Sequence, residues 1–466
     1  MKGIRKLFDL MKGKKVGFVL VLSFLLVSVW ALAQQTAPAA APAAAPAPAA
    51  VAPAAAAPAP AAAPAISAGD TAWVLASAAL VLLMTPGLAF FYAGMVRQKN
   101  VMATIMQSFF MIALISVQWV VFGYSFAFGD GTPWFGGLKW FLLNHMPDVS
   151  PLAPTIPHLA YMIFQAMFAI ITPALICGAF AERVKFTGFV VFSLLWATFI
   201  YDPVCHWVWS PNGYFSALGA LDFAGGTVVH MTAGYSALAL ALLLGTRKGY
   251  GKESMVPHNL TLVLLGASLL WFGWFGFNAG SACAANGLAC NAFVTTNTAT
   301  AMAALSWCLI EFIHRGKATT LGAASGAVAG LVAITPACGF VDLTGSLWIG
   351  ALVSIFCYLA IQVKIKLGYD DSLDAFGVHG VGGTFGAIAT GIWAVKAVNG
   401  HDGLLAGNPG QLWIQVQTVL ATMIFSFLGT VVLYFIVEKT IGFRVSAKDE
   451  ELGLDLSQHG EEGYHI

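Results

Sequence analysis

The stretch Asp-Phe-Ala-Gly-Gly-Thr-Val-Val-His-Met-Thr-Ala-Gly, residues 222–234, places a carboxylate at the start of an apolar segment and His230 eight residues further in. A helix rises about 1.5 Å per residue, so the two groups would lie roughly 12 Å apart along its axis. An ionisable side chain that deep in a membrane segment is costly and marks a transport or proton pathway. A second histidine, His379, follows Asp374 in Asp-Ala-Phe-Gly-Val-His-Gly-Val-Gly-Gly. Two such histidines, each in a stretch flanked by glycines and each behind an acid, indicate a substrate path.

The composition is that of a membrane protein. The chain is 59% hydrophobic and 9% charged, whereas about a quarter of the residues of a soluble domain are charged. Many apolar runs are long enough to span about 30 Å of hydrocarbon, and they are too continuous for barrel strands. The net charge of +1 gives no basic stripe of the kind that binds nucleic acid. We therefore predict an all-α, multi-pass membrane protein that does not bind nucleic acid.

The N-terminal part of the chain is expected to lie outside the folded domain. A basic start is followed by the apolar run 16–30 and by Ala31-Leu32-Ala33, so residues 1–33 are predicted to be a signal peptide cut after Ala33. An uncleaved anchor helix is the alternative. Residues 34–66 are almost entirely alanine and proline, which predicts a disordered or polyproline-like extracytoplasmic linker.

Eleven apolar segments follow, within a predicted transmembrane domain of residues 67–438. Loops on one side of the membrane carry fourteen lysines and arginines, and those on the other carry two, Lys139 and Lys396. The positive-inside rule then places the tail, residues 439–466, in the cytoplasm and the mature N-terminus outside. The predicted segments are 72–94, 101–124, 158–180, 187–203, 225–245, 258–279, 291–313, 319–338, 345–366, 375–396 and 412–438.

Segments one to five and six to ten form two sets. Because five is odd, the second set must be inverted relative to the first, and inverted repeats place a substrate path at their interface near mid-membrane. His230 and His379 fall in the fifth and tenth segments, the last of each set. We therefore predict an inverted 5+5 repeat plus one extra helix, with one pore per subunit.

The seven cysteines show no metal-ligand spacing. Cys177, Cys308 and Cys357 are typical of small core residues. Cys283 and Cys290 share an extracytoplasmic connection and could form a disulfide. No metal and no cofactor are expected.

Characteristic motifs are spread over nearly the whole chain, from about Thr71 to Tyr464. They are Thr85–Gly94, Gly178–Arg183, Asp222–His230, Trp274–Ala282, Thr335–Gly339 and Phe376–Gly380, with Gly442–Ser446, Glu451–Asp455 and His459–Glu461 in the tail. With these motifs the chain resembles the ammonium transporter family, whose animal relatives are the Rhesus glycoproteins. The resemblance implies a homotrimeric transporter or channel for ammonium, in the inner membrane, without enzymatic activity. It also implies that the tail couples subunits and meets a PII-type nitrogen regulatory protein; a merely solvated tail is the alternative.

Aromatic side chains suit recognition of ammonium, because each ring face attracts a cation by about 0.5–2 kcal/mol. By resemblance, Trp209, Phe168 and Ser281 form an outer recruitment site, Phe168 and Phe277 a stacked gate, and Trp274 lines the pore. The alternative reading is an ordinary interfacial aromatic belt. Ser-Pro-Asn at 210–212 departs from the glycine-rich run that the family commonly has there.

Asp222 is predicted to cap a helix and to stabilise the recruited cation, without touching the substrate. His230 and His379 are predicted to line the pore: ammonium gives up a proton near the gate and crosses as ammonia along the two histidines. The alternative is that both are ordinary core histidines whose hydrogen bonds are satisfied. If the two imidazoles share one proton, they titrate as a coupled pair. Whether the released proton follows decides between an ammonia channel and an electrogenic transporter.

Two rival functions remain at this stage. The first is an ammonium sensor with the same fold, although the tail is too short for an appended signalling domain. The second is a membrane metalloenzyme, which would need three or four ligands, often at i, i+3 or i+4 spacing. Each candidate helix has one central histidine and no such neighbour.

Overall fold

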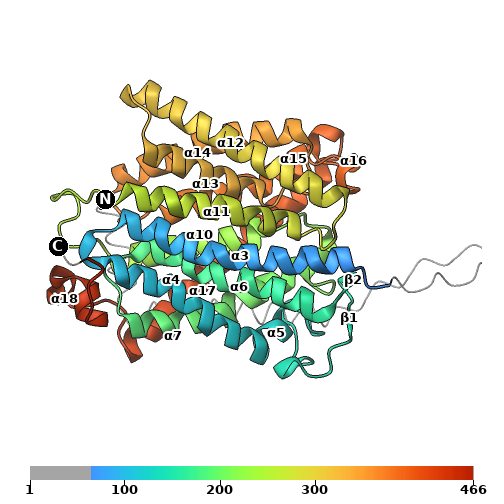
Figure 1. Cartoon of the computed structure of the whole chain (residues 1–466), viewed down its shortest axis with the longest axis horizontal. Coiled ribbons are helices and arrows are strands. Elements are labelled where there is room, and N and C mark those ends of the chain that lie inside the picture. Colours follow the sequence, from blue (N-terminus) through green and yellow to red (C-terminus); the bar gives the residue numbers. More distant parts are fainter. Residues whose placement is uncertain (1–64, 465–466) are drawn as a thin grey trace, which may run out of the picture. The chain divides into compact units, whose positions relative to one another are not determined.

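The structure is a computed structural model in which residues 65–464 are described. The predicted signal peptide and nearly all of the predicted Ala/Pro-rich linker lie outside the described residues. Residues 66–464 belong to one compact unit. Its long helices run side by side in Figure 1, with α3 packed along α11 over much of their length.

The described residues form eleven helical segments that match the eleven predicted ones. Nine are long and apolar enough to cross a membrane, and the other two are α13 and the pair η6 and α15. The all-α class is therefore confirmed. The segments are α3 (Ala68–Met95), α4, η2 and α5 (Val101–Gln118, Trp119–Gly123, Tyr124–Phe128), α6 (His158–Phe180), α7, η4 and α8 (Phe186–Trp196, Ala197–Tyr201, Asp202–Trp209), η5 and α10 (Gly226–Met231, Thr232–Leu244), α11 (Leu260–Gly280), α12 (Gly287–Arg315), α13 (Thr320–Ile334), α14 (Leu343–Leu367), η6 and α15 (Phe376–Gly380, Val381–Trp393), and α17 (Pro409–Thr440).

Several boundaries differ from the prediction. The second and fourth segments continue to Phe128 and Trp209, beyond the predicted ends at 124 and 203. A β-hairpin, β1 (Val149–Ser150) and β2 (Ala153–Pro157), lies in the connection before α6 and was not predicted. The strands escape a sequence reading because prolines interrupt the apolar alternation that would mark them.

Four segments contain a π-helical turn. Two of these turns, η5 and η6, carry His230 and His379, so the regular rise assumed for residues 222–230 is wrong at the start of that helix. A π turn is wider than an α turn and is found mostly as a single turn at a functional site.

The fifth and tenth segments meet at two glycines. A Cβ added to Gly234 would lie 2.1 Å from the Gly380 nitrogen and 2.2 Å from its Cα. The two backbones therefore touch, which brings the histidine-bearing turns together, as expected of an inverted repeat.

The tail folds back onto the start of α4 and the turn before it. Helix α18 (Ala447–Leu452) and turn η8 (Asp455–His459) follow α17. Asp455 Oδ1 accepts a hydrogen bond from the Ala103 nitrogen at 2.8 Å, and Asn100 Oδ1 accepts one from the Leu454 nitrogen at 2.8 Å. Because Asp455 is buried, the tail is not simply a solvated extension.

Candidate functional site

The carboxylate of Asp222 caps turn η5. Its Oδ1 accepts hydrogen bonds from the nitrogens of Gly225 and Gly226 at 2.8 and 2.6 Å. Its Oδ2 accepts from the nitrogens of Thr227 and Val228 at 2.8 and 3.2 Å, and from the Thr227 hydroxyl. Gly225 has a φ of 112°, a conformation that favours glycine and turns the chain around the carboxylate. One side chain thus satisfies all the free N–H groups at the start of the helix that carries His230.

The counterpart of Asp222 in the second half is Asp371. It precedes His379 by eight residues, as Asp222 precedes His230, and it accepts hydrogen bonds from the nitrogens of Ala375 and Phe376 at 3.0 and 2.9 Å. Asp374, the acid noted before His379 in the sequence, does not hold this position. Asp374 instead pairs with Lys364. The equal spacing of eight residues is the signal that could have identified Asp371.

Asp371 also gives the fold a pH dependence. It lies in the connection between α14 and η6, where burial, aided by the nearby Asp374 charge, raises the pKa of its carboxyl from 3.8 to about 6, against the opposing charge of Lys364. The folded protein therefore holds a proton that the unfolded chain has already released between about pH 4 and pH 6. Stability from this group is greatest below the unfolded pKa and falls as pH rises towards 6.

We expect Asp371→Asn to remove this pH dependence, because the amide cannot ionise. Its unfolding free energy, measured by thermal unfolding in detergent, should rise relative to wild type between about pH 4 and pH 7, by at most about 3 kcal/mol. If the unfolding free energies of the two proteins changed with pH in the same way, Asp371 would not titrate in this range.

The rings of His230 and His379 lie against each other. Their Nδ1 atoms are 3.3 Å apart and their ring centroids 5.3 Å apart, at an interplanar angle of 26°. Both side chains are buried, and His230 Nε2 has no hydrogen-bond partner. Two facing Nδ1 atoms make a hydrogen bond only if one carries a proton and the other does not. The geometry therefore suits one proton shared between the two rings.

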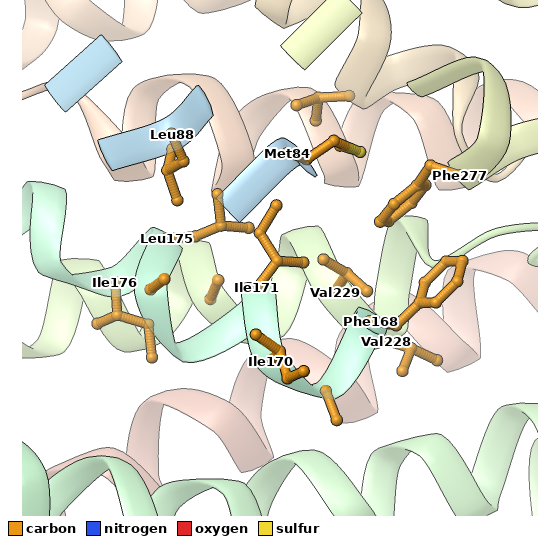
Figure 2. Close-up of a cluster of buried hydrophobic side chains, with 14 of the residues drawn as sticks. Met84, Leu88, Phe168, Ile170, Ile171, Leu175, Ile176, Val228, Val229 and Phe277 are labelled. Atoms are coloured by element: carbon orange, nitrogen blue, oxygen red, sulfur yellow. The ribbon is translucent and has the colours of Figure 1, made fainter. Parts of the chain in front are cut away.

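A row of aromatic rings begins at His230 and ends at Trp209. The centroids of His230 and Phe277 are 6.1 Å apart, those of Phe277 and Phe168 4.2 Å, and those of Phe168 and Trp209 5.8 Å. Figure 2 shows Phe168 and Phe277 beside each other at one end of a shell of apolar side chains. Trp274 lies beside this row, with its ring centroid 5.4 Å from that of His230.

Two hydrogen bonds hold residues at the Trp209 end of this row. Trp209 Nε1 donates to the Asp222 carbonyl oxygen at 2.8 Å, which ties the Trp209 ring to the loop that Asp222 organises. The Ser281 hydroxyl donates to the Phe277 carbonyl oxygen at 2.8 Å. Its hydrogen is thereby engaged, so the oxygen is left free to accept a bond from a donor such as an N–H group.

A narrow cavity runs beside the two histidines. Only about 10 Å³ is open to the centre of a water-sized sphere, which is close to the minimum that holds one water molecule. Figure 2 shows several of its apolar walls, including Met84, Leu88, Ile171 and Leu175. A second small cavity on the far side of His379 is lined by polar residues as well, among them Ser325 and Asp374. The cavity beside the histidines is therefore lined mostly by apolar side chains and has room for about one small molecule.

Two further expectations concern cysteines and metals. Cys283 and Cys290 are both free thiols in the structure, so the suggested disulfide is not formed. Within residues 65–464, no three histidine, cysteine or acidic side chains come together in a way that could hold a metal ion.

Comparison with known proteins shows the family of this chain. Residues 72–464 match the sequence profile of the Ammonium Transporter Family. The chain belongs to that family. It is 50% identical over 400 residues to an ammonium transporter of Bacillus subtilis, covering 85% of this chain and 98% of the relative. It is 48% identical over 400 residues to the ammonium transporter Amt1 of Archaeoglobus fulgidus, covering 86% and 100%.

Solved structures of family members share the fold of this ammonium transporter family protein. Mep2 of Saccharomyces cerevisiae superimposes with a TM-score of 0.78 at 34% identity, covering 82% of this chain and 88% of Mep2. A protein described as a sensor Amt protein superimposes with a TM-score of 0.78 at 29% identity, covering 84% and 98%.

Proposed function

We propose that this protein carries ammonium into the cell across the inner membrane, releasing the proton at the gate and passing ammonia along the twin-histidine pore. The observation that carries the proposal is the unbroken row of rings from Trp209 through Phe168, Phe277 and His230 to His379, with neighbouring centroids 4.2–6.1 Å apart. Membership of the ammonium transporter family supports it.

Recruitment of ammonium begins at the Trp209 end of the row of rings. The rings of Trp209 and Phe168 would attract the cation through their faces, and the Ser281 hydroxyl oxygen would accept one of its N–H groups. Such contacts are worth about 0.5–2 kcal/mol per ring. Potassium is close in size to ammonium but has no N–H group to donate, so the hydrogen bond to Ser281 favours ammonium. The negative charge of the buried Asp222 adds long-range attraction.

Ammonium loses its charge before it enters the apolar cavity beside the histidines. Moving a bare ion into a low-dielectric path costs of order 20 kcal/mol in the idealised limit, whereas neutral ammonia avoids that cost. The Phe168 and Phe277 rings separate the recruitment site from the cavity beside the histidines, which has room for about one small molecule. There the coupled imidazoles would offer ammonia a donor on one ring and an acceptor on the other.

The released proton follows through the histidines, so that transport carries net charge. The membrane potential then favours uptake by about 2.3 kcal/mol per 100 mV. The Nδ1 atoms of His230 and His379 lie 3.3 Å apart, close enough to share a proton, beside a cavity with room for about one small molecule, which supports this version over a pure ammonia channel.

The remaining parts of the proposal concern assembly and regulation. The mature N-terminus lies outside and the tail in the cytoplasm, because the basic loops share the tail's side of the membrane. Three copies form a homotrimer with one pore each. The tail, which packs on the loop at Asn100, is proposed to receive a PII-type regulatory protein, and the protein is not an enzyme.

Transport by the purified protein separates this proposal from the sensor alternative. Proteoliposomes with an internal pH dye should respond to an external ammonium pulse at least about tenfold faster than liposomes without protein, a difference of ~1.4 kcal/mol in the barrier. A potassium pulse is the control and should give no such response. Folded protein that leaves the rate at the empty-liposome value would favour a sensor.

A further inference from the structure

A buried acid lies outside the proposed pore. Asp202 is the first residue of α8, with 0% of its surface exposed, and Gln118 is the last residue of α4, with 2% exposed. Gln118 Nε2 donates a hydrogen bond to Asp202 Oδ2 at 2.7 Å. The pair joins the second and fourth segments. Neither residue is one of the aromatic or histidine residues of the proposed path.

The other two oxygens of this pair are unsatisfied. Asp202 Oδ1 and Gln118 Oε1 are both buried and have no hydrogen-bond partner. Two oxygens that carry only lone pairs cannot bond to each other, and a buried polar atom without a partner is costly. A single proton between them would satisfy both.

Within residues 65–464, no lysine, arginine or histidine nitrogen forms an ion pair with Asp202. His206, one turn further along α8, directs its two ring nitrogens to the carbonyl oxygens of Ala127 and Thr132 at 3.0 and 2.8 Å. The other titratable neighbours, Tyr201 and Cys205, are neutral groups. An uncompensated carboxylate inside a membrane segment carries a cost of several kcal/mol or more.

We propose that Asp202 is a proton-binding site, held as a neutral carboxylic acid in a two-hydrogen-bond ring with Gln118. The acid O–H donates to Gln118 Oε1, and Gln118 Nε2 donates to the acid carbonyl oxygen. Both unsatisfied oxygens then have a partner, and no charge is left in the membrane.

The hydrogen-bonded ring of Asp202 and Gln118 lies beside two π turns. Gln118 directly precedes the π turn η2, and Asp202 directly follows the π turn η4. The ring therefore fixes α4 to α8 where both segments widen. Since α8 ends at Trp209, the same ring anchors the helix that carries the outer aromatic of the proposed path.

Infrared spectroscopy of the reconstituted protein, without ammonium, tests the protonation directly. The wild type should show the carbonyl stretch of a protonated carboxylic acid, above the amide band, and Asp202→Asn and Asp202→Leu should both lose it. The band should persist from about pH 7 to pH 9, where Asp371 has released its proton and which is well above the ordinary carboxyl pKa. Spectra of wild type and both variants that coincide in this region, or a wild-type band lost by pH 7, would overturn the proposal.

Thermal unfolding provides a second test that does not depend on transport. Asp202→Asn should melt with the wild type, because an amide pair retains both hydrogen bonds. Gln118→Leu and Asp202→Leu should each melt lower, and the double variant should lose less than the sum of the two. Additive losses would contradict the ring. The infrared and unfolding measurements both test the protonation of Asp202 even if the protein proves not to transport ammonium.

Discussion

Asp222→Ala is expected to be the most damaging single change in this protein. It removes the acceptor of four backbone N–H groups and of the Thr227 hydroxyl, all buried at the start of η5. Each buried donor left without a partner costs about 1–3 kcal/mol, so a loss above about 4 kcal/mol is expected. Thermal unfolding and the yield of folded protein measure it.

Asp342→Ala is the matched control for that change. Asp342 caps α14 through a single bond, from the Gly345 nitrogen to its Oδ1 at 2.8 Å. Its loss should cost only about 1 kcal/mol. Equal melting temperatures for the two variants would show that Asp222 is an ordinary cap.

Gly234→Ala is expected to separate the two histidine-bearing turns. The added Cβ would overlap the Gly380 backbone at 2.1 and 2.2 Å, and backbone cannot rotate away as a side chain can. Overpacking of this kind costs about 3 kcal/mol or more when relief requires a helix to move. Ammonium uptake in proteoliposomes should fall to the background rate, and the melting temperature should drop.

Gly287→Ala serves as the control for this change. Gly287 is the first residue of α12, and a Cβ there meets nothing within 4 Å. That variant should transport as the wild type does and melt at the same temperature or slightly higher. If Gly234→Ala behaved in the same way, close contact between the fifth and tenth segments would not be needed.

The membrane architecture could be predicted because long apolar runs have one physical solution in lipid, the helix. The meeting of His230 and His379 could be predicted because each occupies the same place in one of two inverted sets. Both arguments use properties that extend over twenty residues or more, where the sequence signal is strong.

Local features of the site could not be predicted in the same way. A π turn of five or six residues is too short to leave a periodic pattern. The choice between Asp371 and Asp374 depends on backbone direction, since Asp374 has a φ of 59° and its side chain pairs with Lys364 rather than with the helix start. The partnership of Gln118 with Asp202 requires two segments to pack in one register, which no local pattern reveals.

The most direct test of the central claim is the current evoked by an ammonium jump on a solid-supported membrane carrying the reconstituted protein. We expect a transient current in the wild type and in a control substituted at the exposed His145, and none on a potassium jump. In His230→Ala and His379→Ala, verified as folded, the ammonium current should fall at least about tenfold. Wild-type currents in both pore variants, or no ammonium current in the wild type, would contradict the proposal that ammonium gives up its proton and crosses along these two imidazoles with net charge movement.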